Sequence, residues 1–124
     1  MKTQSNIRIL VVDDDESLLA MLKSILEREG FDVDAAEDGD VALKLIAQNR
    51  YDLMTLGVKM PRVDGLEVLR EMRSLPYPPK TIMLSGCEEL KVVMESVRLG
   101  AADYMSKPFD EQSLIAAIYR VLES

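Results

Sequence analysis

Short apolar runs alternate with longer amphipathic segments along this chain, and the alternation limits the fold more than any other feature. The runs are too short to be read as helices, and several are rich in β-branched residues, so they predict buried strands. In the longer segments, apolar residues recur at helical spacing. The predicted strands are 7–12, 31–36, 53–57, 81–84 and 102–105, and the predicted helices cover 17–29, 41–46, 66–72, 90–97 and 114–122.

Strands that alternate with helices in this way indicate βαβ units. Because crossovers between parallel strands are right-handed, the helices cover both faces of the sheet, and the predicted fold class is a doubly wound α/β fold. A chain of 124 residues fits one domain, residues 1–124. In such folds ligands bind outside the carboxyl ends of the strands, so the residues that follow each strand are candidates for a site.

The composition argues against several classes of protein. No apolar run approaches the length of about 18 residues that a membrane span needs, and the N-terminus leads into a strand instead of a signal peptide, so we expect a cytoplasmic protein. The net charge of −7 argues against direct contact with nucleic acid. Histidine, the usual general base and zinc ligand, is absent. The single cysteine, Cys87, is expected to be an inert small residue, open to oxidation if it lies in a loop.

Polar residues follow several of the predicted strands. Asp13 and Asp14 follow the first, Ser85 the fourth and Lys107 the fifth, whereas the third ends in Gly57. Carboxylates hold Mg²⁺, and hydroxyl and ammonium groups contact phosphoryl oxygens, so these residue types suit phosphoryl chemistry. Two carboxylates at a sheet edge also repel each other unless a cation relieves the repulsion. No nucleophile stands at the centre of the edge, where Gly57 is expected.

Other residues near these positions have simple structural interpretations. Asp15 and Glu16 are expected to form the N-cap and the acidic first turn of a helix. Asp64 and Gly65 predict a turn and a helix start, and Tyr104 predicts packing on its strand. The eight methionines are scattered through the helical stripes and are expected to fill the core.

The chain resembles the receiver domain of two-component response regulators in four segments, ILVVDDDESL, DLMTLGVKMPRVDGLEVL, IMLSG and GAADYMSKPF. These segments stand in the family's order and spacing and cover essentially the whole chain. The resemblance implies a flavodoxin-like parallel sheet with strand order 2-1-3-4-5. It also implies a role in phosphorelay signal transduction, and not an enzyme.

In receivers, an aspartate at the end of the third strand accepts phosphate from a histidine of the sensor kinase. Asp52, Met60 and Pro61 match the flanking pattern without a gap, and the acceptor position is then Gly57. The resemblance therefore implies either an atypical, phosphorylation-independent receiver or an ordinary receiver whose acceptor has been replaced. Thr55, at a position that is usually apolar in the family, slightly favours the first.

The resemblance also implies roles at the other strand ends. Asp13, Asp14 and the backbone carbonyl of Lys59 match the magnesium ligands, and Mg²⁺ is expected to bind weakly without the acceptor carboxylate. Ser85 and Lys107 match the residues that contact the phosphoryl group.

A switch pair is implied by the resemblance as well, formed by Ser85 and Tyr104. The peptide bond between Lys107 and Pro108 is expected to be cis, which proline tolerates. Without an acceptor carboxylate, the ammonium group of Lys107 is expected to turn toward the acidic pair and to stand partly in place of the metal.

The implied partners are a sensor histidine kinase or another two-component protein. Dimer or output contacts in the family imply a surface formed by helix 90–97, strand 102–105 and helix 114–122, through which a homodimer would form. No contact with nucleic acid or with a membrane is expected.

Two other classes fit parts of the pattern. Asp13-x-Asp15-x-Ser17 is similar to the motif of haloacid-dehalogenase phosphohydrolases, with Ser85 and Lys107 as the second and third motifs. Against this class, the chain lacks the further strand with a later acidic pair, and it has no cap. A flavodoxin-like FMN carrier would need a phosphate loop rich in Ser and Thr, and the acidic run DDDES would repel the phosphate.

Overall fold

The computed structural model describes residues 6–86 and 90–124, so Cys87 lies outside the described residues. Every predicted strand and helix is present within a few residues of its predicted bounds. None of the helices in the described part of the chain is long and apolar enough to cross a membrane. The elements are β1 (Arg8–Val12), α1 (Glu16–Arg28), β2 (Asp32–Ala36), α2 (Gly39–Gln48), β3 (Leu53–Gly57), α3 (Gly65–Met72), β4 (Lys80–Ser85), α4 (Leu90–Arg98), β5 (Asp103–Ser106) and α5 (Glu111–Glu123).

The strands form one parallel sheet in the order β2-β1-β3-β4-β5, which confirms the predicted topology. The register aligns the strand ends, because Val12 pairs with Leu56 and Gly57 pairs with Leu84. The carboxyl ends of the central strands therefore meet at one edge. β2 lies at the side of the sheet.

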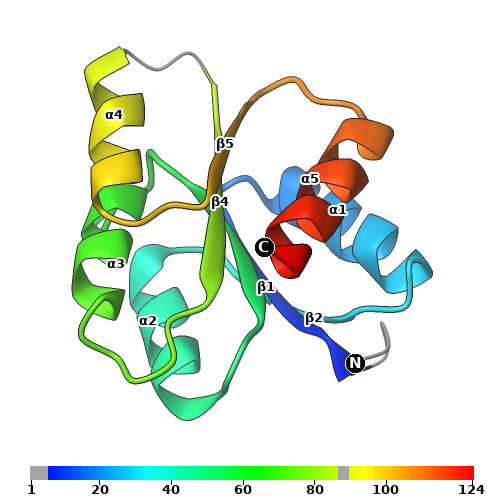
Figure 1. Ribbon diagram of the computed structural model, residues 1–124, viewed down its shortest axis with the longest axis horizontal. Coiled ribbons are helices and arrows are strands. Elements are labelled where there is room, and N and C mark those ends of the chain that lie inside the picture. Colours follow the sequence, from blue (N-terminus) through cyan, green and yellow to red (C-terminus); the bar gives the residue numbers. More distant parts are fainter. Residues whose placement is uncertain (1–5, 87–89) are drawn as a thin grey trace.

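Helices cover both faces of the sheet. Figure 1 shows α1 and α5 on one side of the strands and α2, α3 and α4 on the other. Successive strand residues point to opposite faces, so each strand contributes to both halves of the core. Ile9, Leu53 and Ile82 face α1 and α5, whereas Leu10, Met54 and Met83 belong to the other cluster.

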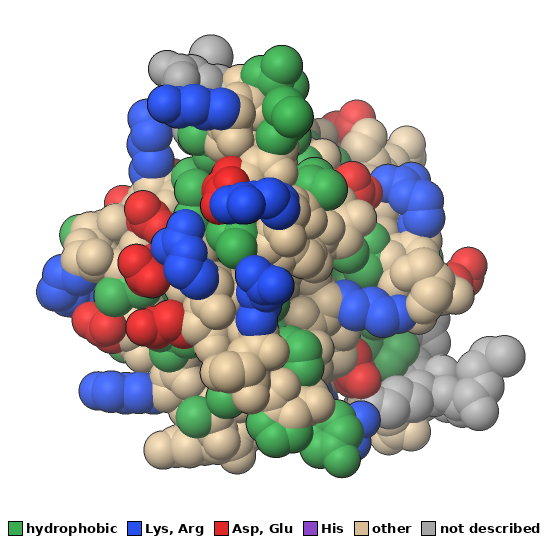
Figure 2. Space-filling view, turned by 60° about the vertical axis from the view of Figure 1, so that its left-hand side comes forward, with side chains coloured by type: hydrophobic (Ala, Val, Ile, Leu, Met, Phe, Trp, Pro, Cys, Tyr) green, Lys and Arg blue, Asp and Glu red, His purple; other side chains and the backbone are tan. Residues whose placement is uncertain are grey.

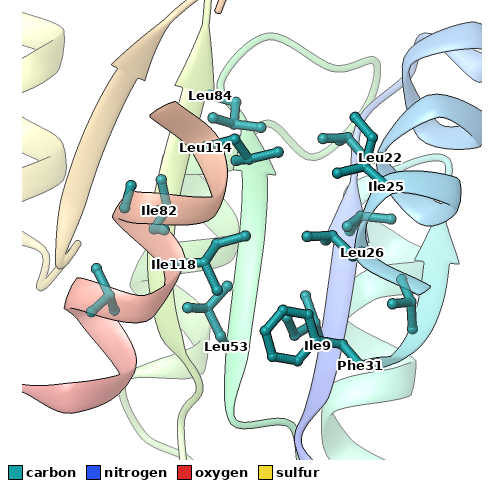
Figure 3. Packing of buried hydrophobic residues seen from close by; sticks show 14 of the residues in the cluster. Ile9, Leu22, Ile25, Leu26, Phe31, Leu53, Ile82, Leu84, Leu114 and Ile118 are labelled. Carbon is teal, nitrogen blue, oxygen red and sulfur yellow. The ribbon is translucent and has the colours of Figure 1, made fainter. Parts of the chain in front are cut away.

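The core on the α1 and α5 side is built mostly from aliphatic side chains, with the ring of Phe31 among them (Figure 3). Leu26 of α1 and Ile118 of α5 are fully buried, as is Leu53 of the sheet between them. Burying a large aliphatic side chain contributes roughly 1.5–3 kcal/mol, so these contacts hold both helices against the sheet.

Aspartates start most of the described helices. At each such start a carboxylate accepts a hydrogen bond from one or two backbone N–H groups of the first turn. These N–H groups have no acceptor within the helix. The capping residues are Asp15, Asp38, Asp64 and Asp110. The predicted helix starts at Asp15 and Asp64 are confirmed. Gly30 and Gly100 follow α1 and α4 with φ angles of 99° and 102°, a conformation that glycine adopts without strain.

The apolar stripe of α4 does not face the core. Leu90, Met94 and Val97 are 73%, 61% and 60% exposed, and the buried side chain of this helix is Ser96, whose hydroxyl donates to a backbone carbonyl of the helix. An apolar stripe at helical spacing normally faces the core, and α4 departs from that rule. The prediction that the methionines fill the core is therefore wrong for Met94, and also for Met21, which is 45% exposed.

Candidate functional site

Asp13 begins the site, directly after β1, and its side chain is buried among the strand ends. The residue is 3% exposed, and its backbone N–H donates to the carbonyl of Ala36 at 3.2 Å. One carboxylate oxygen, Oδ1, accepts from the backbone N–H of Asp15 at 3.0 Å. Asp14, by contrast, is exposed. The two acidic residues thus have different surroundings, although they are adjacent in sequence.

Lys107 reaches across the sheet edge to Asp13. Its Nζ lies 2.8 Å from Asp13 Oδ2, and the lysine and aspartate side chains are 30% and 4% exposed. The backbone N–H of Lys107 donates to the carbonyl of Ser85 at 2.6 Å, which fixes the lysine beside β4. The Lys107–Pro108 peptide bond is cis, as expected.

The lysine was predicted to turn toward both acidic residues, and this is correct for only one of them. Within residues 6–86 and 90–124, Lys107 forms its ion pair with Asp13 and none with Asp14. Water solvates the exposed carboxylate of Asp14, whereas the buried carboxylate of Asp13 needs a cationic partner.

Gly57 ends β3 at the centre of the edge, and the carboxylate of Asp13 lies against it. A Cβ built on Gly57 would stand 2.8 Å from Asp13 Oδ2 and 3.3 Å from Asp13 Cγ. The start of α3 approaches from another side, because the N–H of Gly65 donates to the carbonyl of Val58 at 2.7 Å. A Cβ on Gly65 would overlap the carbonyl oxygen of Gly57, so this contact requires a glycine.

A hollow of about 320 Å³ opens beside Gly57, toward β4 and β5. Ser85, which ends β4, is 2% exposed, and Lys107 lines the same hollow. Among the described residues, the lining contains two ammonium groups and no carboxylate. The lining residues are Gly57, Val58, Lys59, Leu84, Ser85, Gly86 and Lys107.

The donors predicted for Mg²⁺ have the right chemistry, since carboxylate and carbonyl oxygens are the ligands this ion prefers. Both carboxylate oxygens of Asp13 already accept a hydrogen bond. Oδ1 accepts from the backbone N–H of Asp15, and Oδ2 accepts from the ammonium group of Lys107. In the described part of the chain, no group of three or more acidic, cysteine or histidine residues is placed to hold a metal. The residues fit a weakly held ion that competes with Lys107 for Asp13.

Tyr104 and Asp15 have structural roles, in packing and in helix capping. Tyr104 lies in β5 opposite Met83 and packs, partly buried, against the core on the α2, α3 and α4 side, which confirms the packing interpretation. It does not line the hollow. The carboxylate of Asp15 accepts from the backbone N–H groups of Ser17 and Leu18, and so serves as the cap of α1.

A contact that the sequence did not predict holds the loop after β3. Arg62, with a φ angle of 67°, forms ion pairs with Asp38 and with Asp40, the latter at 3.4 Å. The hydrogen bond from the backbone N–H of Val41, followed by the charge of Arg62, holds the pKa of Asp38 below its ordinary value of 3.8. Asp38 was recognisable as a helix cap, but nothing in the sequence indicates the backbone conformation of Arg62.

Comparison with known proteins gives one consistent result. The family model for the response regulator receiver domain matches residues 9–119. The chain is 39% identical over 117 residues to the alkaline phosphatase synthesis transcriptional regulatory protein PhoP of Bacillus subtilis, covering 94% of this chain and 49% of that protein. It is 40% identical over 115 residues to the transcriptional regulatory protein CpxR of Escherichia coli, again covering 49% of the relative. The chain thus spans about half the length of these curated relatives.

Solved structures agree with this match. A CheY-like receiver domain protein of Methanospirillum hungatei is 33% identical, with a TM-score of 0.91 and 94% of each chain covered. The Francisella response regulator 1452 receiver domain is 32% identical, with a TM-score of 0.87, covering 95% of this chain and 98% of the other.

Proposed function

Because this chain belongs to the response regulator receiver domain family, we propose that residues 1–124 form a single atypical receiver of two-component signalling, without a phosphoacceptor at Gly57. A natural phosphorylation-independent receiver and a receiver whose acceptor was replaced both have this chemistry. In either case the domain signals through protein contacts, and it is not an enzyme.

The observation that carries the proposal is the state of Asp13 beside Gly57. A receiver transfers a phosphoryl group to a carboxylate at the end of β3, and glycine offers no nucleophilic atom there. Among the described residues, Asp13 has the carboxylate nearest to Gly57, but it is 3% exposed and bonded at both oxygens. Asp13 and Lys107 therefore neutralise each other. In an ordinary receiver the lysine would instead pair with the acceptor carboxylate.

Mg²⁺ would be held by Asp13, Asp14 and the backbone carbonyl of Lys59, and would supply positive charge to balance the two carboxylates. Binding is weak, because Mg²⁺ must displace Lys107 from Asp13 and the third carboxylate is missing. The ammonium group of Lys107 thereby takes over part of the neutralisation that a metal provides. By their match to the family's motifs, Ser85 and Lys107 are proposed as phosphoryl contacts, and Ser85 and Tyr104 as the switch pair.

Partners are proposed from the family and from the surface. A sensor kinase or another two-component protein is the expected partner, and α4, β5 and α5 form the proposed contact surface. Figure 2 turns the side that bears α4 forward and shows hydrophobic side chains at the molecular surface among the charged ones. Leu90, Met94 and Val97 are exposed there, so a homodimer through this surface would bury apolar area.

The proposal is tested by the intact mass of the protein after incubation with Mg²⁺ and acetyl phosphate. Wild type and the Gly57→Asp variant are compared, and we expect only the variant to gain a phosphoryl group. A gain by the wild type would show a substitute acceptor and overturn the proposal. If neither protein gains mass, the site has lost more than its acceptor and functions through contacts alone.

A further inference from the structure

The backbone of Arg62 has a conformation that calls for an explanation. Its φ angle of 67° lies in the left-handed region, and within the described part of the chain no other residue besides glycine has a positive φ. Glycine would adopt this conformation without strain. An arginine that stands here in spite of the strain is a candidate for a function of its side chain.

Two carboxylates hold the side chain of Arg62. Its Nη2 donates to Asp38 Oδ2, and its Nε lies 3.4 Å from Asp40 Oδ2, so the guanidinium group spans both residues. The other oxygen of Asp38, Oδ1, accepts from the backbone N–H of Val41 at 2.9 Å. A guanidinium group presents its donors in a fixed planar fork, which suits two acceptors. Asp38 therefore both caps α2 and holds the loop after β3.

The first turn of α2 also packs directly against this loop, residues 58–64. A Cβ built on Gly39 would overlap the carbonyl oxygen of Val63 and would stand 2.8 Å from its Cβ. The loop closes where the N–H of Gly65 donates to the carbonyl of Val58 at 2.7 Å. The ion pairs of the arginine thus add to close backbone contacts and fix the loop against α2.

The beginning of the same loop belongs to the candidate site. Val58 and Lys59 line the hollow beside Gly57, and the backbone carbonyl of Lys59 is one of the proposed magnesium ligands. A carboxylate ligand can adjust by rotation about its side-chain bonds, whereas a backbone carbonyl stays where its loop is held. Mg²⁺ demands near-ideal octahedral geometry, so its affinity depends on the position of that carbonyl.

We propose that Arg62 is a positioning residue for magnesium binding, because it holds residues 58–64 against α2 and thereby fixes the carbonyl of Lys59. Arg62 is itself a cation and no ligand, so it acts through the backbone of the loop. The inference rests on the proposed function, since the magnesium site is part of it. Gly57 supplies no carboxylate, so the remaining ligands, the carbonyl among them, carry a larger share of the affinity.

The test is the dissociation constant of Mg²⁺ for the full chain, measured by titration at constant ionic strength and followed by amide NMR at Asp14 and Lys59. Arg62→Gly keeps the left-handed backbone without strain but removes the guanidinium group. We expect it to bind Mg²⁺ roughly tenfold more weakly than the wild type, as when a residue that supports a metal ligand is lost. Electrostatics alone predicts the opposite sign, because removing a positive charge favours a bound cation.

A second background and a charge control accompany this comparison. In the Gly57→Asp protein an additional carboxylate should strengthen Mg²⁺ binding, and Arg62→Gly should weaken the binding there as well. Arg28→Gln is the charge control, because Arg28 is 66% exposed, against 65% for Arg62, and lies at the end of α1 that is remote from Asp13. It is expected to change the affinity by less than about twofold.

Hydrogen exchange provides a readout that needs no metal. The amide N–H groups within residues 59–64 should exchange faster in Arg62→Gly than in the wild type, because the loop is then free of its ion pairs. If the arginine had no positioning role, relief of the backbone strain would leave this exchange unchanged or make it slower.

Equal or tighter Mg²⁺ binding by Arg62→Gly would overturn the inference, and so would unchanged or slower exchange in the loop. Absence of Mg²⁺ binding in both the wild type and Gly57→Asp would overturn it too. These failures are distinct from that of the proposed function, which fails if the wild type gains mass with acetyl phosphate.

Discussion

The carboxylate of Asp13 lies between the ammonium group of Lys107 and the backbone of Gly57. Its Oδ2 is 2.8 Å from Lys107 Nζ and also 2.8 Å from the point where a Cβ on residue 57 would stand. The ion pair and the glycine are therefore coupled, because a side chain at position 57 would displace the oxygen that Lys107 binds. The first two predictions follow from this arrangement.

Replacing the lysine should leave a buried carboxylate without its cation. We expect Lys107→Gln to lower the free energy of unfolding by about 2 kcal/mol, less than for a fully buried pair because the lysine is partly exposed. Mg²⁺ should restore part of the loss by binding Asp13. Urea unfolding with and without Mg²⁺ measures both effects. The control is Lys23→Gln, which removes an exposed pair with Glu27 and should cost less than about 1 kcal/mol. Equal losses in the two variants would contradict the prediction.

A side chain at position 57 should destabilise the fold, because it would crowd or repel the carboxylate of Asp13. Gly57→Ala is expected to cost about 1–3 kcal/mol, because its Cβ crowds the carboxylate. Without Mg²⁺, Gly57→Asp should lower the free energy of unfolding by more than Gly57→Ala does, because two carboxylates then repel each other. Added Mg²⁺ should reduce this extra loss, because both carboxylates can bind the cation. Gly86→Ala is the matched control, since its Cβ meets no neighbour within 4 Å. If Gly57→Ala unfolds at the same urea concentration as Gly86→Ala, Asp13 does not limit this position.

Thr55 carries a buried hydroxyl without a hydrogen-bond partner in the described part of the chain, and it is 0% exposed. Thr55→Val replaces the hydroxyl by a methyl group of similar size, and should stabilise the fold by about 1 kcal/mol. Thr81 is equally buried, but its hydroxyl donates to the carbonyl of Pro79 at 3.2 Å. Thr81→Val should therefore destabilise the protein by a similar amount. Thermal unfolding of both variants decides, and shifts of the same sign would refute the explanation.

Acid should weaken the attachment of the loop after β3. The pKa of Asp38 is lowered in the folded protein, so its contribution to stability is present above 3.8 and is lost as the pH falls below that value toward the folded pKa. Asp38→Asn keeps a capping oxygen but removes the charge. The wild type should be more stable than this variant at neutral pH, and the difference should vanish in acid.

Urea unfolding over a range of pH measures this difference. Asp40→Asn is the control, because Asp40 contacts the same arginine but caps no helix. A difference between wild type and Asp38→Asn that persists at low pH would show that charge is not its source.

The exposed apolar residues of α4 should contribute little to folding. Met94→Ala is expected to change the free energy of unfolding by less than about 0.5 kcal/mol. Met72→Ala, which truncates a side chain that is 4% exposed in α3, should cost about 2–5 kcal/mol. Urea unfolding compares the two, and a large loss in Met94→Ala would place that residue in the core after all.

Much of the fold was predictable because strands and helices differ in the spacing of their apolar residues. The run Leu53–Gly57 was predicted with its bounds, and the other strands to within one residue at either end. The orientation of α4 was not predictable. Ser96, a small polar residue, is the side chain that packs inward there, and its hydroxyl is satisfied within the helix.

The site shows the same division between pattern and geometry. The turn of Lys107 toward the acidic pair was predicted from the family resemblance, which places an acceptor carboxylate where Gly57 stands, and the contact with Asp13 is present. The exposure of Asp14, which leaves it outside this contact, depends on the direction of a side chain after β1 and has no signal in the sequence. The same is true of Arg62, whose left-handed backbone brings it to Asp38.

The all-parallel sheet also has a consequence for the order of folding. Neighbouring strands are joined by crossovers and never by hairpins, so strand pairing is non-local and the chain should fold slowly for its size. Asp13 and Lys107 are 94 positions apart, and their contact closes most of the chain into one loop. This loop closes at low entropic cost only after β3, β4 and β5 have assembled. The ion pair should therefore form among the last native contacts, with a φ-value near zero for Lys107→Gln.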